Sequence, residues 1–225
     1  MHETCLLVRV DAFATAQFTG NPAAVCLLDA ETTQALHSQD LQAIAAELNQ
    51  PATCFVYTMQ QDQEFSTASR FAVRWFTPVT ELPLCGHGTL AAAAAIFQGN
   101  QHQTLDFETS KGLISVQRLR EDSNGLPLMQ LALPRSECSA DLPPGLNLNP
   151  LTLKTIVGDL PIQDIQYAEG VRNALIVLGS GVTRHQLESL QPDLQRMLCT
   201  LSKTQLNGVM VTCQGQSAPA VWSLT

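Results

Sequence analysis

The segment at positions 90–97, LAAAAAIF, is apolar on every side, and it constrains the fold more than any other part of the 225-residue chain. Alanine and leucine favour the helical conformation. A helix without a polar face has to be enclosed by the rest of the protein. Strand patterns dominate the sequence around it, so we expect a sheet curled around this helix. An ordinary core helix is compatible with the same pattern.

The remaining patterns predict a mixed α+β architecture. Polar residues interleave with apolar ones at helical spacing over 36–48, and Asn149 followed by Pro150 is a typical helix start. A turn is expected at 17–22 and a loop between Pro78 and Pro83. We expect further helices near 183–190 and 193–201, and strands at 5–10, 23–28, 53–57, 70–77, 104–109, 113–119, 128–133, 162–168, 174–178 and 208–212.

A stretch rich in Pro, Gly, Asn and Ser runs from Pro134 to Pro150 and is the best candidate for a linker. We therefore expect two halves, 1–134 and 135–225. The second half has fewer predicted strands than the first, and the segment 214–225 carries no periodicity. Its sheet is therefore expected to be incomplete.

The charge balance argues against a nucleic-acid partner. The chain has 12 Lys and Arg against 20 Asp and Glu, a net charge of −8, and no basic cluster. No run approaches the about 18 apolar residues of a membrane span. The N-terminus lacks the basic region of a signal peptide. We expect no membrane association.

The seven cysteines are not arranged as a disulfide scaffold or a zinc site. They lie at 5, 26, 54, 85, 138, 199 and 213 and never form a CxxC pair. Cys5, Cys26 and Cys54 lie inside apolar, strand-like runs, where a reduced thiol packs as a small hydrophobic group. We therefore expect a cytoplasmic protein without a zinc site.

The loop directly before the apolar helix is the strongest candidate for chemistry. It reads Cys85-Gly86-His87-Gly88-Thr89. Glycines allow a ligand to approach the backbone closely, and free amides at a helix start favour an anion such as a carboxylate. The imidazole of His87 titrates near neutrality and can carry protons. The thiol of Cys85 could serve as a base if the helix end lowers its pKa.

A purely structural interpretation fits the same loop. In this interpretation Cys85 packs in the core, His87 makes its hydrogen bonds within the loop, and the glycines mark the start of the helix. Other acidic candidates are weaker, since Asp11 follows a strand, Glu47 lies on the polar side of an amphipathic helix and Glu81 lies in a loop. The sequence holds no HExxH, GxSxG, GxGxxG or P-loop string, which leaves metalloprotease, α/β-hydrolase, dinucleotide-binding and P-loop functions unsupported.

Three blocks read together resemble one known family. They are DAF-x4-FTGNPAAVCLL at 11–28, IAAELNQPATCFV at 44–56 and RWFTPVTELPLCGHGTLAAAA at 74–94. In this order and spacing they resemble the PhzF family, the phenazine-biosynthesis-like proteins related to diaminopimelate epimerase. The resemblance is strong in the first half and continues weakly through PRSEC, the helix after Asn149 and NGVMVT.

The resemblance implies two similar halves, each a curled, mostly antiparallel sheet around a central helix, with the active site between them. It also implies a homodimer and a cofactor-independent isomerase that moves a proton on a small carboxylic acid. Gly86, Gly88, Thr89 and Asn21 of the GNP string would bind the substrate. The catalytic candidates are His87, Cys85 and Glu47.

Two departures separate this chain from the family pattern. Family isomerases carry a glutamate as proton shuttle in a string like NLSETAF, and the matching position here is Ala52. The C-terminal block resembling EDPVTGSAH, which supplies an aspartate, is absent, as expected of a truncated or frameshifted product. Of the family's Glu, His and Asp, only His87 is present.

Three hypotheses follow. The first is an isomerase in which the Cys85 and His87 pair replaces the missing glutamate. The second is a non-catalytic relative that binds a small ligand or a partner protein. The third is a partial gene product with little function of its own, whose incomplete second half exposes apolar surface.

Overall fold

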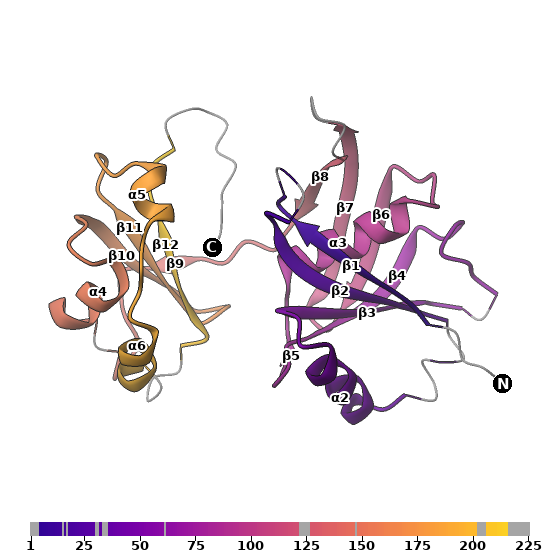
Figure 1. Cartoon of the computed structure of the whole chain (residues 1–225), viewed down its shortest axis with the longest axis horizontal. Coiled ribbons are helices and arrows are strands. Elements are labelled where there is room, and N and C mark those ends of the chain that lie inside the picture. The colour runs from indigo at the N-terminus through magenta and orange to yellow at the C-terminus, as the bar shows by residue number, and fades with distance from the viewer. Residues whose placement is uncertain are drawn as a thin grey trace. The chain divides into compact units, whose positions relative to one another are not determined.

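The computed structural model describes residues 5–14, 16, 18–29, 32, 36–60, 62–121, 127–146, 148–201 and 206–215. The chain divides into two compact units, Met1–Pro134 and Arg135–Thr225. Both units combine helices and strands, so the predicted α+β class is confirmed (Figure 1). No helix within the described ranges is long and apolar enough to cross a membrane.

The first unit is built on an eight-stranded sheet in the order β1-β2-β3-β4-β6-β7-β8, with β5 paired to β4. Most neighbours are antiparallel, and β2 with β3 and β4 with β6 are parallel. The strands are β1 (Leu6–Ala12), β2 (Asn21–Leu28), β3 (Ala52–Thr58), β4 (Arg70–Phe76), β5 (Glu81–Leu82), β6 (Thr104–Thr109), β7 (Gly112–Glu121) and β8 (Pro127–Ala132).

Helix α3 (Gly86–Phe97) lies inside the curl of this sheet. It contacts β1 and β2 at one end of the strand order and β7 and β8 at the other, so the sheet wraps around it (Figure 1). No residue of α3 is exposed, and Ala91, Ala92 and Ala93 are completely buried. This is the enclosure predicted for an all-apolar helix. The structure extends the helix four residues upstream of the predicted 90–97.

The sheet has two apolar faces because side chains alternate along each strand. Cys54 and Val56 of β3 pack with the buried side of α3, whereas Phe55 between them packs with α2 (Ser38–Leu48). Leu41 and Ala45 of α2 are buried against this second face. Helices α2 and α3 therefore cover opposite faces of the same strands.

The segment between Pro78 and Pro83, expected to be a loop, contains the short strand β5. It forms a hairpin with the end of β4, closed by a hydrogen bond from the Thr77 amide to the Thr80 carbonyl oxygen at 2.8 Å. Two residues are too few for a strand to show alternation in the sequence. The predicted turn at 17–22 ends earlier than expected, because β2 already begins at Asn21.

The second unit holds a four-stranded sheet in the order β12-β11-β10-β9. Ile156 and Val157 of helix α4 and Ile176 and Leu178 of strand β11 form its core. Asn149 caps α4 by accepting a hydrogen bond from the Thr152 amide at 2.9 Å, as predicted from the Asn-Pro start. That this unit repeats the first stays a prediction. Its elements are β9 (Cys138–Ser139), α4 (Pro150–Val157), β10 (Ile162–Ala168), β11 (Asn173–Leu178), α5 (Arg184–Glu188), α6 (Leu194–Leu201) and β12 (Gly208–Thr212).

The first turn of α3 touches the sheet so closely that only glycine fits at position 88. A Cβ at Gly88 would lie 2.8 Å from Cys54 Sγ, 3.0 Å from Cys85 Sγ and 3.0 Å from Trp75 Cδ1. All three neighbours are buried side chains, so none can move away without disturbing the core.

We therefore expect Gly88→Ala to lower the free energy of unfolding by about 1–3 kcal/mol, the usual effect of overpacking. Gly99→Ala is the matched control, because a Cβ there meets no atom within 4 Å. Urea denaturation of both variants measures the difference. Equal stability of the two variants would contradict the described packing.

Candidate functional site

The start of α3 presents backbone amides that the helix itself does not use. Cys85 is the N-cap residue, with extended backbone at φ −145° and ψ 103°. The amide of Thr89 donates to the Cys85 carbonyl oxygen at 3.0 Å, and the Thr89 hydroxyl donates to the same oxygen at 2.7 Å. The amides of residues 86–88 precede this first helical bond and have no carbonyl acceptor within the helix. The Gly88 amide interacts with the Cys85 thiol, which leaves the amides of Gly86 and His87. They and the helix dipole favour a bound anion.

Cys85 and His87 lie side by side in this turn. Cys85 Sγ is 3.4 Å from His87 Nδ1. The other ring nitrogen, His87 Nε2, is buried and has no hydrogen-bond partner among the described residues. One side of the imidazole thus contacts the thiol, and the nitrogen on the other side has no hydrogen-bond partner among the described residues.

Burial keeps this pair uncharged. It raises the pKa of the Cys85 thiol to about 11, against a smaller opposing effect of the Gly88 backbone amide. It also lowers the pKa of His87. The helix end therefore does not make Cys85 a thiolate near neutral pH, because desolvation of the charged form dominates.

Cys54 and Trp75 form the floor of the site. Cys54 is completely buried on β3, and its thiol donates to the Gly88 carbonyl oxygen at 3.3 Å. Trp75 of β4 is also buried, and its Nε1 lacks a hydrogen-bond partner in the described structure. Ala52 precedes Cys54 by two residues and belongs to the same core face. The position to which the family resemblance assigns a glutamate therefore faces α3.

The structure brings some of the predicted site residues together but not all. Cys85, Gly86, His87, Gly88 and Thr89 share the first turn of α3. Asn21 is exposed at the start of β2, two residues before Ala23, which pairs with Ala52 in the sheet.

Glu47 does not join this group. Its side chain is exposed on α2, and that helix packs on the sheet face opposite to α3. The amphipathic pattern of α2 indicates a solvent-facing Glu47 but does not say which sheet face the helix covers.

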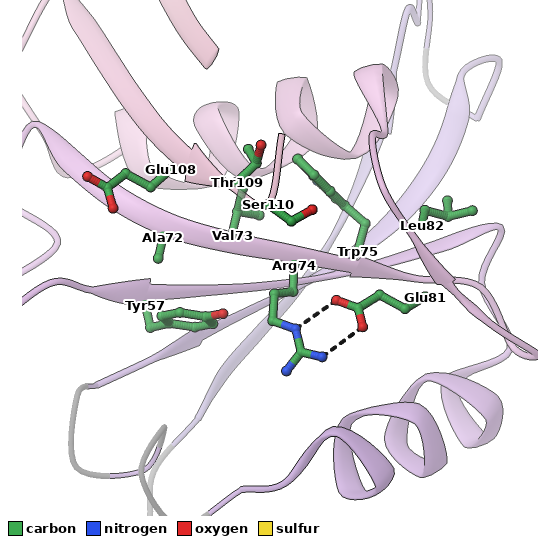
Figure 2. A pocket seen from close by; sticks show the side chains of 10 residues that line it. All are labelled: Tyr57, Ala72, Val73, Arg74, Trp75, Glu81, Leu82, Glu108, Thr109 and Ser110. Atoms are coloured by element: carbon green, nitrogen blue, oxygen red, sulfur yellow. Dashed lines mark hydrogen bonds and ion pairs between the residues drawn. The ribbon is translucent and has the colours of Figure 1, made fainter. Parts of the chain in front are cut away.

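A hollow of about 310 Å³ lies along β4 and was not expected from the sequence; neither Cys85 nor His87 lines it. Figure 2 shows Arg74 pairing there with Glu81, with Nε to Oε1 and Nη2 to Oε2 both at 2.8 Å. The Arg74 guanidinium lowers the pKa of Glu81. Glu81 is thus a partner of arginine rather than a free carboxylate. The hairpin that joins them, β4 to β5, is the element that sequence patterns missed.

Asp11, the remaining acidic candidate, contacts Arg9 at 3.5 Å between Oδ1 and Nη2. Within the part of the chain that the structure describes, no three His, Cys, Asp or Glu side chains converge in a way that could hold a metal ion.

Comparisons with known proteins agree on one family. The family model for phenazine biosynthesis-like proteins, PhzC-PhzF, matches residues 10–220. A phenazine biosynthesis-like domain-containing protein of Bos taurus is 36% identical over 208 residues, which are 92% of this chain and 68% of the bovine protein. An uncharacterized isomerase of Pseudomonas aeruginosa is 43% identical over 114 residues, 50% of this chain and 39% of that protein.

A solved structure extends the agreement to the fold. The PhzF-family phenazine biosynthesis protein of Enterococcus faecalis superposes with a TM-score of 0.63 at 28% identity, over 94% of this chain and 69% of its own. With the family model, the bovine relative and this fold in agreement, the chain belongs to the phenazine biosynthesis-like protein family, PhzC-PhzF.

Proposed function

We propose that this protein is an isomerase that moves a proton on a small carboxylic acid without a cofactor. The observation that carries the proposal is the pairing of Cys85 and His87, 3.4 Å apart, at a helix start with free amides. The isomerase name of the Pseudomonas aeruginosa relative supports the reaction type.

The substrate carboxylate would bind at the amides of Gly86 and His87. Each hydrogen bond to a charged group contributes about 1.5–3 kcal/mol, and the helix dipole adds roughly 0.3–1 kcal/mol. Gly86 leaves room for this approach, since a Cβ there would meet only Leu131 at 3.7 Å and Leu133 at 3.8 Å.

The proton would travel through the Cys85 and His87 pair. Ala52 has no titratable proton, so it cannot transfer a proton as the glutamate of family isomerases does at the matching position. His87 Nε2 is the ring atom without a protein partner and is therefore the one that would meet the substrate. Cys85 would supply or receive the proton on the other side of the ring. We also propose a homodimer in a reducing cytosol.

Solvent deuterium exchange tests the catalytic role. Wild-type protein is incubated in deuterium oxide with a panel of 2-hydroxy and 2-amino carboxylates, and deuterium in the carbon–hydrogen positions is measured by mass spectrometry. His87→Asn is expected to slow the incorporation roughly 10²–10⁴-fold, the usual size of an acid–base contribution. His102→Asn is the control, because His102 is exposed and contacts the Thr67 carbonyl oxygen at 3.0 Å. Unchanged exchange in His87→Asn and Cys85→Ala would refute the mechanism.

A second function, binding without turnover, is favoured by Ala52. A buried methyl group in place of the glutamate leaves the carboxylate-binding amides intact while removing the acid. A bound small carboxylate, or a partner that presents one, would then be retained at α3 without being converted.

Calorimetric titration with the same carboxylates separates the two functions. Gly86→Phe is expected to weaken binding at least about tenfold, because a bulky side chain would cover the amides. Gly99→Phe, at a position with open space, is expected to bind like wild type. If the wild-type protein binds a carboxylate without deuterium exchange, and Gly86→Phe no longer binds it, the non-catalytic function is established. If Gly86→Phe and Gly99→Phe bind equally well, the carboxylate does not bind at the start of α3.

A further inference from the structure

We propose that Cys85 is a positioning residue that donates its S–H proton to His87 Nδ1 and thereby holds the imidazole in its Nε2–H form. The hydrogen position follows from the Cys85–His87 contact and the chemistry of the two groups. Its consequence for turnover rests on the function proposed above.

The backbone places the two side chains together. Cys85 is the extended N-cap residue, and His87 is the second residue of the helix that follows. The 3.4 Å separation between Sγ and Nδ1 therefore joins two groups on one rigid turn. Gly88, the next residue, is locked against Cys54 and Trp75, which keeps the turn in place.

The direction of the hydrogen bond follows from the two groups. A thiol sulfur is a weak acceptor, whereas the lone pair of a neutral imidazole nitrogen is a good one. The thiol carries its proton near neutral pH because burial raises its pKa to about 11. The S–H of Cys85 therefore donates, and Nδ1 accepts. A neutral imidazole has a single N–H, which must then be on Nε2.

The neighbouring thiol does not compete for this position. Cys54 has its own acceptor, the Gly88 carbonyl oxygen at 3.3 Å. The two buried thiols beneath this turn thus have separate partners, and only Cys85 reaches the imidazole ring.

The result is a buried Nε2–H donor without a protein acceptor in the described structure. Leaving such a donor unpaired costs free energy, so a ligand oxygen or another acceptor is favoured there. In turnover, the Nε2–H bond would break as the proton forms a C–H bond to one substrate carbon, and the Cys85 S–H bond would break as Nδ1–H forms, leaving a thiolate and a neutral imidazole. The unprotonated Nε2 would then take a proton from a different substrate carbon while Nδ1–H returns its proton to the thiolate. One C–H bond is formed and another is broken, and the Cys85 and His87 pair returns to its starting state.

Two-bond proton–nitrogen NMR of protein labelled with ¹⁵N-histidine reads the tautomer directly, with His87→Asn to assign the signal. At pH 8 we expect wild-type His87 to carry its proton on Nε2. Cys85→Ala should shift the ratio of tautomers about fivefold toward Nδ1–H, the equivalent of one hydrogen bond of about 1 kcal/mol. Cys85→Ser should restore the Nε2–H form, because a hydroxyl also donates to Nδ1.

Cys54→Ala is the control, since it removes a buried thiol of β3 that contacts the same turn but is directed at the Gly88 carbonyl oxygen and not at the ring, and the tautomer should stay as in wild type. A wild-type His87 protonated on Nδ1 would overturn the proposal, and this measurement needs no substitution of Cys85. An unchanged tautomer ratio in folded Cys85→Ala would also overturn it. An Nε2–H histidine in a protein without deuterium exchange would leave Cys85 as the positioning residue and refute the isomerase function alone.

Discussion

The burial of α3 inside the curled sheet is the constraint on which the rest of the first unit depends. Its alanines allow the strands to approach closely, and strands from both ends of the sheet order touch it. Because the helix is enclosed, its first turn is held against β3 and β4 instead of opening freely to solvent. The chemistry of Cys85 and His87 is a consequence of this position.

The same burial that holds the helix decides the charges at its start. A helix N-terminus in water would stabilise a thiolate, but here desolvation is the larger effect and raises the pKa of Cys85. The pKa of His87 falls for the same reason. The site is thus a neutral thiol next to a neutral imidazole, in which the positions of hydrogens matter more than ion pairing.

The burial of α3 could be predicted because it follows from the residues of the helix alone. A helix that is apolar on every side is stable only when the rest of the protein encloses it. The Asn149 cap was predictable for the same reason. The hairpin of β4 and β5 was not, since its two-residue strand depends on pairing with Trp75 and Phe76. The placement of Glu47 also needed the structure, because an amphipathic pattern indicates a buried side but not the face of the sheet that buries it.

The loop motif predicted which residues meet at the helix start. It did not predict how Cys85 affects His87, because that depends on the desolvation of both side chains, which a sequence does not display.

The glutamates considered as catalytic candidates lie elsewhere or are already paired. Glu81 is bound by Arg74, Glu47 lies on α2 across the sheet, and position 52 is an alanine. Among the described residues at the first turn of α3, the titratable side chains discussed above are Cys54, Cys85 and His87. Burial raises the pKa of Cys54 well above its ordinary value, and its thiol is directed at a backbone carbonyl oxygen. The imidazole that Cys85 contacts is therefore the group of this turn to which we assign the proton transfer in the proposed function.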